Sequence, residues 1–254
     1  MNKTILKESD LRRLYIDEQK TDVEISYLYG CAKSTVYKTR KRFGIVAFKR
    51  WQRHIFEPTE KQLQIIYGSL LGDASISNGR KGKYDCESIF EEHHCAAQKQ
   101  YIFWKYDELK NLCSSGPKED NVGRWRIRTF HHPFFSQLRK TWYPEGIKII
   151  PKNILNEIGV LGLAVWFMDD GSLSKESNFI KLHTCSFSEK EHDVLSLWLK
   201  EKFCINSHMK IYSGYRNLII DLDSRKDFVN LIKDHVIESM KYKVTFREYH
   251  TWEN

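Results

Sequence analysis

The strongest constraint on the fold is a short apolar stretch that ends in acidic residues and occurs twice. Residues 162–171 are Gly-Leu-Ala-Val-Trp-Phe-Met-Asp-Asp-Gly, and residues 66–74 are Ile-Tyr-Gly-Ser-Leu-Leu-Gly-Asp-Ala. Asp73 and Asp170, the last acids of the two copies, are 170 − 73 = 97 positions apart. One unusual stretch that is repeated within a chain predicts a duplicated unit with a pseudo-twofold axis. We expect the two copies to form the active site together.

A similar succession of elements follows each copy. After each acid, the apolar residues change from helical spacing to strand alternation, and helical spacing then returns. Two further pairs keep nearly the same offset, Trp104 with Trp198 (198 − 104 = 94) and Phe134 with Phe228 (228 − 134 = 94). The sequence therefore predicts an α+β fold built from two α-β-β-α-β-β-α repeats.

The two repeats are predicted over residues 58–147 and 148–254. In the first we expect a helix over 58–73, a hairpin at 76–83, a strand at 88–92, a helix over 98–112, a strand over 123–130 and a short helix after Pro133. In the second we expect a helix over 160–170, a strand over 179–187, a helix over 189–203, strands at 209–212 and 217–223, and a helix over 227–236. Within 123–130, apolar residues alternate with Arg124, Arg126 and Arg128, so one face should be buried and the other should carry guanidinium groups.

Residues 1–44 have a different character. Residues 1–54 hold 13 Lys and Arg against 6 Asp and Glu, whereas the other 200 residues hold 28 against 27. A helix, a second helix capped at Thr21, a turn at Gly30 and a third helix match the helix-turn-helix pattern. The third helix would present to a DNA major groove the residues Lys33, Ser34, Thr35, Lys38 and Arg42. A three-helix packing module with an exposed basic helix is the alternative, and the local charge favours DNA contact. Residues 45–57 are predicted to be a basic linker.

The position of the repeated acids predicts chemistry. An apolar helix with small residues is most often core, so we expect the two helices to pack together. The C-terminal end of a helix disfavours a carboxylate by about 0.3–1 kcal/mol, and two such ends in one place need a cation. Oxygen ligands favour Mg²⁺, with Mn²⁺ or Ca²⁺ as alternatives, over zinc. The predicted ligands are Asp73 and Asp170, with the backbone carbonyl groups of Gly72 and Asp169 as additions; for Asp169 we expect a backbone or capping role.

A divalent cation on a basic protein indicates phosphodiester hydrolysis. The formal net charge is +8 and the pI is about 9.0, which favours a polyanionic partner. Lys148 follows Asp73 by 148 − 73 = 75 positions, and Lys243 follows Asp170 by 243 − 170 = 73. A single lysine is most often a solvated surface residue. A pair matched by the repeat instead predicts cationic groups that stabilise charge on the reacting phosphate.

The remaining composition argues against other classes of protein. The six cysteines form no C-x-x-C pair, which fits reduced thiols better than a disulfide framework. His93, His94 and Cys95 near Cys86 resemble part of a zinc site, but no second ligand pair has zinc spacing. There is no apolar signal region and no apolar run of membrane-spanning length. We expect a protein without membrane contact inside the cell, in the cytoplasm, the nucleoid or a DNA-containing organelle.

The two stretches resemble the motif that names the LAGLIDADG homing endonucleases, in the branch with two motifs in one chain. Residues 163–171 and 66–74 align with it, and the last acid of each falls on its last acidic position. The resemblance extends from about residue 58 to the end of the chain. It includes Lys-x-x-Pro at 148–151, Thr-Cys-Ser-Phe-Ser at 184–188 and Met-Lys-Tyr-Lys at 240–243.

The resemblance implies specific roles for these residues. Asp73 and Asp170 would bind the divalent metal ions, and Lys148 and Lys243 would assist at the scissile phosphates. The first motif departs from the family pattern, because Ala74 replaces the final Gly, but its acid is retained. The helix-turn-helix lies outside the family core and would be an additional DNA contact.

The resemblance also implies two four-stranded antiparallel sheets that form a saddle over a long, asymmetric DNA site. Strand side chains would contact the major groove, and the helix ends would cut both strands across the minor groove. The positions suited to DNA contact in the two sheets are Arg80, Lys81, Lys83, Arg124, Arg126, Arg128, Lys181 and His183. The expected partner is double-stranded DNA, and the expected state is a monomer.

The sequence thus predicts a site-specific double-strand DNA endonuclease that promotes the mobility of an intron or similar element. The alternatives are a maturase that binds its host intron RNA, with or without cutting, and a DNA-binding regulator on an inactive nuclease core. Retention of both Asp and both Lys argues against the inactive core. An intein is disfavoured, because the chain begins with Met and ends in Thr-Trp-Glu-Asn without a splicing-type His-Asn.

Overall fold

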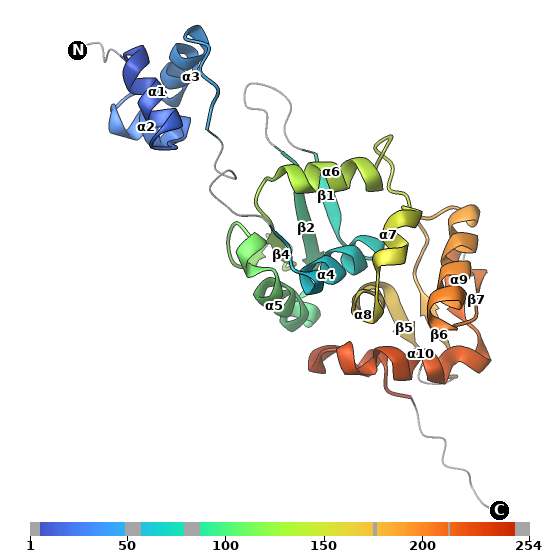
Figure 1. The fold of residues 1–254 in the computed structure, drawn as a ribbon. Helices are drawn as coiled ribbons and strands as arrows, with labels where there is room; N and C mark the ends of the chain where they lie inside the picture. Colours follow the sequence, from blue (N-terminus) through green and yellow to red (C-terminus); the bar gives the residue numbers. More distant parts are fainter. Residues whose placement is uncertain (1–5, 49–56, 79–86, 175–176, 213, 247–254) are drawn as a thin grey trace, which may run out of the picture. The chain divides into compact units, whose positions relative to one another are not determined.

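The computed structural model divides the chain into two compact units, Met1–Glu57 and Pro58–Asn254 (Figure 1). It describes residues 6–48, 57–78, 87–174, 177–212 and 214–246. The boundary between the two units coincides with the end of the predicted basic linker, residues 45–57.

Three helices form the N-terminal unit: α1 (Glu8–Ile16), α2 (Asp22–Leu28) and α3 (Lys33–Arg42). Leu11, Ile25 and Val36, one from each helix, are fully buried in its core. Thr21 and Glu24 form a capping box at the start of α2, which supplies partners for backbone N–H groups there. A buried ion pair between Asp22 and Arg40, at 2.9 Å, also joins α2 to α3. These features explain why so short a segment packs as a unit of its own.

The second unit contains two repeats with the predicted order of elements (Figure 1). The first consists of α4 (Glu60–Leu71), β1 (Ser75–Ser77), β2 (Ile89–His94), α5 (Lys99–Glu108), β3 (Lys118–Glu119), β4 (Trp125–Arg128) and α6 (Pro133–Trp142). The second consists of α8 (Val160–Asp170), β5 (Gly171–Leu173), β6 (Ile180–Leu182), α9 (Glu189–Phe203), β7 (Ser207–Tyr212), β8 (Tyr215–Ile220) and α10 (Arg225–Ile232). Short 3₁₀ turns are η2 (Ala96–Gln98), η3 (Lys110–Leu112), η4 (Leu222–Ser224), η5 (Lys233–His235) and η6 (Glu238–Lys243).

Each repeat forms one antiparallel four-stranded sheet, and the two sheets have equivalent topology. The strand orders are β1-β2-β4-β3 and β5-β6-β8-β7. The predicted fold class is therefore confirmed.

Helices α4 and α8 lie side by side between the sheets (Figure 1). Glycines allow this close approach, as predicted. A Cβ atom at Gly68 would lie 2.3 Å from the carbonyl oxygen of Gly162 and 2.9 Å from Cβ of Val165. A Cβ atom at Gly72 would lie 2.5 Å from Cβ of Asp169. The small residues therefore bring the ends of the two helices into one place.

The structure differs from the sequence predictions at several boundaries. Helix α7 (Lys152–Glu157) was not predicted, because it lies between the repeats and is too short to show a helical period. The strand predicted over 123–130 is only β4, and helix α10 ends four residues before the predicted end at 236. Three basic residues of the predicted hairpin lie outside the described residues, namely Arg80, Lys81 and Lys83.

The remaining predictions concern thiols and membranes. Among the described residues, Cys31, Cys95, Cys113, Cys185 and Cys204 are free. Within the same part of the chain, every helix is too short or too polar to cross a bilayer.

Candidate active site at the paired helix ends

The last acids of the two repeats share one electrostatic environment. Asp170 is the final residue of α8, and Asp73 follows the end of α4 by two residues. Burial raises the pKa of Asp170 to about 8, and the charges of Asp73 and Asp169 add to this effect. The side chain of Asp73 remains 41% exposed. The structure thus gathers carboxylates at a partly open position, where a cation would relieve their repulsion.

The two predicted lysines both reach these helix ends. Nζ of Lys148 donates hydrogen bonds to the carbonyl oxygens of Gly72 (3.0 Å) and Ala74 (3.1 Å), on either side of Asp73. Nζ of Lys243 donates to those of Met168 (2.6 Å) and Asp169 (3.1 Å). Each ammonium group therefore opposes the negative end of one helix.

These hydrogen bonds bear on the backbone carbonyl groups of Gly72 and Asp169, which were predicted as additional metal ligands. The carbonyl groups predicted to bind metal already accept hydrogen bonds from lysine. Burial lowers the pKa of both Lys148 and Lys243, although the surrounding aspartates act in the opposite direction. Each lysine thus contacts the end of one of the two paired helices, Lys148 at α4 and Lys243 at α8.

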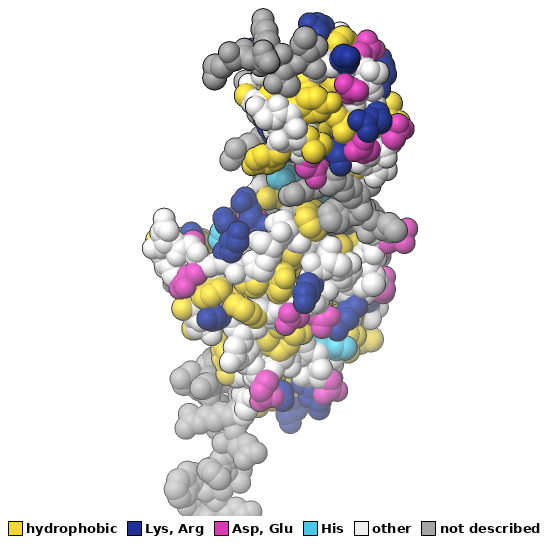
Figure 2. All heavy atoms as spheres, turned by 90° about the vertical axis from the view of Figure 1, so that its left-hand side faces the viewer, with side chains coloured by type: hydrophobic (Ala, Val, Ile, Leu, Met, Phe, Trp, Pro, Cys, Tyr) yellow, Lys and Arg dark blue, Asp and Glu magenta, His cyan; other side chains and the backbone are white. Residues whose placement is uncertain are grey.

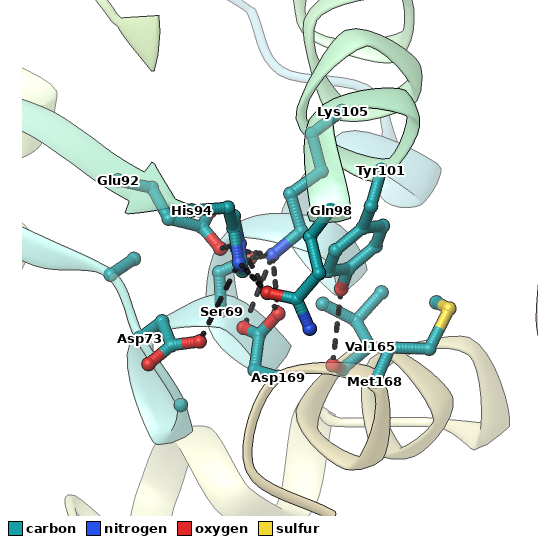
Figure 3. Close-up of polar contacts among 12 residues, drawn as sticks. Ser69, Asp73, Glu92, His94, Gln98, Tyr101, Lys105, Val165, Met168 and Asp169 are labelled. Carbon is teal, nitrogen blue, oxygen red and sulfur yellow. Dashed lines mark hydrogen bonds and ion pairs between the residues drawn. The ribbon is translucent and has the colours of Figure 1, made fainter. Parts of the chain in front are cut away.

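A buried cluster of charged residues lies next to Asp73, and the sequence did not predict it (Figure 3). Its centre is Lys105 of α5, whose side chain is fully buried. Nζ of Lys105 donates to Oδ1 of Asp169 (2.8 Å) and Oγ of Ser69 (2.7 Å), and it also contacts Glu92 of β2. The cluster therefore joins the first repeat to α8 of the second.

The cluster shifts the pKa of each of its members. Burial alone would raise the pKa of Glu92, but Lys105 and His94 lower it to about 2. Burial raises the pKa of Asp169 to about 7, against the opposing effect of Lys105. Burial lowers the pKa of Lys105, but Asp169 and Glu92 outweigh it, so the net shift is upward. Lys105 thus remains a fixed positive charge inside the protein.

His94 of β2 connects this cluster to Asp73 (Figure 3). Its Nε2 lies 2.7 Å from Oε1 of Glu92, and its Nδ1 lies 3.0 Å from Oε1 of Gln98. Nδ1 is also 3.7 Å from Oδ2 of Asp73. Burial lowers the pKa of His94, but Glu92 outweighs this effect and the net shift is upward. One ligand atom each from Asp73, His94 and Asp169 lie within 4.8 Å of one another.

Sequence patterns contained a signal for this cluster. Glu92 and His94 occupy the same face of β2 as the buried Phe90. Lys105 lies four residues after buried Tyr101, on the apolar stripe of α5. A polar residue at a position that its period assigns to the core needs a partner, and that rule would have selected all three.

The outer face of each sheet, turned away from its buried residues, carries those predicted DNA-contacting side chains that lie on described strands, namely Arg126, Arg128 and Lys181. In the first sheet, Arg126 is opposite His93, and Arg128 forms a 3.0 Å ion pair with Glu91. Arg124 precedes β4 and pairs with Asp120 at 2.9 Å.

In the second sheet the outer face includes Lys181 of β6, with His183 exposed just after the strand. Nζ of Lys181 lies 5.9 Å from the ring centroid of Tyr212, and Nζ of Lys210 lies 5.2 Å from it. The two outer faces therefore differ: the first carries mainly guanidinium groups, and the second carries ammonium groups with aromatic rings.

In the N-terminal unit, Thr35, Lys38 and Arg42 are exposed on α3, whereas Lys33 and Ser34 are half-buried. Arg40 is different, because it pairs with Asp22 at 2.9 Å and is buried. On the face drawn in Figure 2, basic and acidic side chains of this unit lie next to one another. The charge on this face of the unit is therefore mixed.

A family comparison covers both helix ends and both sheets. A family model described as the LAGLIDADG DNA endonuclease family matches residues 63–228. The chain belongs to the LAGLIDADG family. The match includes Asp73 and Asp170 but ends before Lys243, and it does not include the N-terminal unit.

Similar proteins come from several organisms. The chain is 30% identical to the cytochrome b mRNA maturase bI2 of Debaryomyces hansenii, over 86% of this chain and 84% of that protein. It is 28% identical to the DNA endonuclease I-ChuI of Chlamydomonas applanata, over 74% of this chain and 95% of that one. Among solved structures, the homing endonuclease I-WcaI bound to its DNA recognition sequence is similar, with a TM-score of 0.69 and 25% identity, over 82% of this chain and 98% of that chain. The LAGLIDADG core accounts for both sheets and both helix ends.

Proposed function

We propose that this protein is a site-specific double-strand DNA endonuclease that uses a divalent metal ion and promotes the mobility of an intron or similar element. The observation that carries the proposal is the pair of repeat-related acids, Asp73 and Asp170, at two helix ends that pack together. The similarity to I-WcaI, which binds a DNA recognition sequence, supports DNA as the substrate.

The donor groups fit a hard divalent cation. Asp73 and Asp170 present carboxylate oxygens, the ligands that Mg²⁺ prefers, at a partly open position. Burial and the neighbouring carboxylates raise the pKa of Asp170, which a bound divalent cation would lower again. Mg²⁺ is the proposed ion, with Mn²⁺ as a substitute. When bound, a divalent ion supplies Lewis acidity to the attacking and leaving oxygens of the phosphodiester.

The protein's own residues would bind the metal ion, stabilise charge on the phosphate and hold the DNA. Asp73 and Asp170 would hold the ion at the helix ends. Lys148 and Lys243 would place an ammonium group on each side, where charge develops on the phosphate. The outer faces of the sheets would hold the duplex through residues such as Arg126 and Lys181. Helix α3 of the N-terminal unit would add contacts as part of a helix-turn-helix.

RNA binding is a second candidate function. The similarity to a cytochrome b mRNA maturase extends over 86% of this chain, which supports binding of a host intron RNA in addition to DNA. A maturase role and a nuclease role are compatible, since only the nuclease role needs the carboxylates at the helix ends.

The decisive experiment begins with selection of a cleavable target from randomised duplex DNA in Mg²⁺. On that target, Asp73→Asn and Asp170→Asn are each expected to abolish double-strand cutting and to leave DNA affinity largely intact. Lys148→Ala and Lys243→Ala should slow cutting by on the order of 10²-fold, the effect of losing one transition-state donor. Mg²⁺-dependent cutting by the double Asp variant would refute the mechanism. Splicing assistance by the same variant would support the RNA function separately.

A further inference from the structure

The two helix ends have different neighbours in the adjacent strand. Ser75 and Ser172 each follow the repeat acid by two residues and pair with Glu91 and Lys181, respectively. Counting three positions further along β2 and β6 gives His94 and Thr184 as equivalent residues. The strand next to Asp73 therefore offers a ring nitrogen, and the strand next to Asp170 offers a hydroxyl group.

The imidazole of His94 is oriented for binding on one side. Its Nε2 is held by Oε1 of Glu92 at 2.7 Å, in the arrangement by which a carboxylate orients a metal-ligating histidine. Its Nδ1 is 3.7 Å from Oδ2 of Asp73, which is too long for a hydrogen bond. Two ligands that are each about 2.0–2.2 Å from one ion lie roughly 3–4 Å apart, so a separation of 3.7 Å lies at the wide end of the range for a shared cation.

Two other side chains, those of Asp169 and Gln98, lie beside the space between His94 and Asp73. Both carboxylate oxygens of Asp169 accept hydrogen bonds from Lys105, at 2.8 and 3.1 Å, so Asp169 balances charge instead of offering a free ligand atom. Oε1 of Gln98 lies 3.0 Å from the same Nδ1 atom, so binding of a cation there would require this partly buried side chain to move.

The second repeat lacks an equivalent nitrogen at this place. Oγ1 of Thr184 is 2.8 Å from Nε2 of His192, whose Nδ1 lies 2.8 Å from the carbonyl oxygen of Ser188. Both ring nitrogens of His192 are thus engaged inside the protein. The ring of His183, which is exposed, lies 3.5 Å from Oγ of Ser172.

We propose that Nδ1 of His94 and a carboxylate oxygen of Asp73 bind one divalent cation, which gives the first repeat a mixed nitrogen and oxygen site. Its use in DNA cutting rests on the proposed function; the binding itself does not. Imidazole binds first-row transition-metal ions, most weakly Mn²⁺ and more strongly Co²⁺ and Zn²⁺, in preference to Mg²⁺, which prefers oxygen ligands. The two halves of the active site would therefore differ in their preferred metal.

Pulsed electron paramagnetic resonance of Mn²⁺ with the full-length protein in excess tests the ligand directly, because a bound imidazole nitrogen couples to the metal. We expect this coupling in the wild type and its loss in His94→Gln. His192→Gln and His183→Gln are the matched controls and should keep it. Asp73→Asn removes the other ligand from a partly exposed position, so it provides the answer if His94→Gln does not fold. Coupling that is absent from the wild type, or unchanged in His94→Gln and Asp73→Asn, would overturn the proposal.

A second measurement separates this inference from the proposed function. The rates at which the two strands of the selected target are nicked are expected to differ in Mg²⁺ and to become more similar in Mn²⁺, and His94→Gln should remove that metal dependence. Nitrogen coupling without cutting of any DNA would refute the endonuclease and leave the site standing. Cutting that needs both acids, without nitrogen coupling, would refute the site and leave the endonuclease standing.

Discussion

Single residues determine how much unbalanced charge the candidate active site contains. Lys105 lies between the carboxylates of Glu92 and Asp169 with no exposure to water. Charges in such a place are costly to bury, and they become more costly when one partner is removed. The cluster is therefore a point at which stability and the geometry of the site depend on the same atoms.

We expect Lys105→Met to destabilise the protein by about 3–5 kcal/mol, the usual cost of breaking a buried ion pair. The loss should be smaller at pH 5 than at pH 8, because burial raises the pKa of Asp169 to about 7 and protonation relieves the remaining charge. Urea unfolding measures both. The control is Lys61→Met, which breaks a 2.6 Å pair with Glu108 at a lysine that is 55% exposed, and which should cost less than about 1 kcal/mol. Equal losses in the two variants would show that the cluster has no special role.

The buried carboxyl group of Asp170 should make the stability of the metal-free protein depend on pH. Burial, with the charge of Asp73, raises its pKa to about 8 in the folded protein, whereas an unfolded aspartate has a pKa of about 3.9. Between these values the folded state binds the extra proton. Its contribution to stability is therefore complete below pH ~4 and is lost as pH rises through about 8, by at most about 1.4 kcal/mol per pH unit.

In EDTA, Tm of the wild type should thus fall relative to Asp170→Asn as pH rises from about 5 to 9. Mg²⁺ should restore Tm of the wild type at high pH and have little effect on the variant. Thermal melts at several pH values provide the comparison. Parallel curves for the two proteins would mean that Asp170 is already ionised in the folded state.

Only some of the residues that form the site could be identified from the sequence. Asp73, Asp170, Lys148 and Lys243 occur in repeated contexts, and repetition exposes them. Lys105 has no such counterpart, since the offset of 94 places buried Leu199 in its position. Its role depends on which strand lies above α5 and in which register, and a local pattern does not contain that information.

At the scale of elements, the contact between α4 and α8 holds the two repeats together. Gly68→Ala would place a methyl group 2.3 Å from a backbone carbonyl oxygen of α8, so the helices would have to separate. We expect a loss of about 1–3 kcal/mol, as for other overpacked cores, together with reduced cutting because both acids depend on this contact. Gly116→Ala is the matched control, since its nearest neighbour would be 3.9 Å away. Guanidinium unfolding tests the pair, and equal stability of the two variants would contradict this account.

Most elements followed from periodicity. The change from helical to alternating spacing after each acid located α4, β1 and α8, whereas β5 (Gly171–Leu173) was missed because the strand expected after the second acid began at residue 179. Element lengths were less predictable: strand pairing covers only Trp125–Arg128 of the predicted 123–130, and residue alternation does not show where pairing with a neighbour ends. Helix α7 was not predicted, because its six residues do not complete two helical turns and so show no helical period.

At the scale of the whole molecule, two compact units would share one polyanionic partner. If α3 contacts phosphates, replacing Lys38 and Arg42 by Ala in the full chain should weaken DNA binding. The slope of log affinity against log salt should fall by about 0.9 for each lost contact. Arg12→Ala, at a 50% exposed arginine of α1, should leave the slope unchanged. Fluorescence anisotropy at several salt concentrations measures this, and identical slopes would make the N-terminal unit a packing module.

The outer faces of the two sheets have a consequence for evolution under the proposed function. Arg126 and Lys181 lie on the strands, whereas Asp73 and Asp170 lie where the helices end, so the two sets share no residue. Substitutions on the strands can alter which duplex is bound while the carboxylates and their lysines stay in place. A mobile element whose insertion site drifts over generations can therefore follow it by changing one surface, without having to rebuild the chemistry.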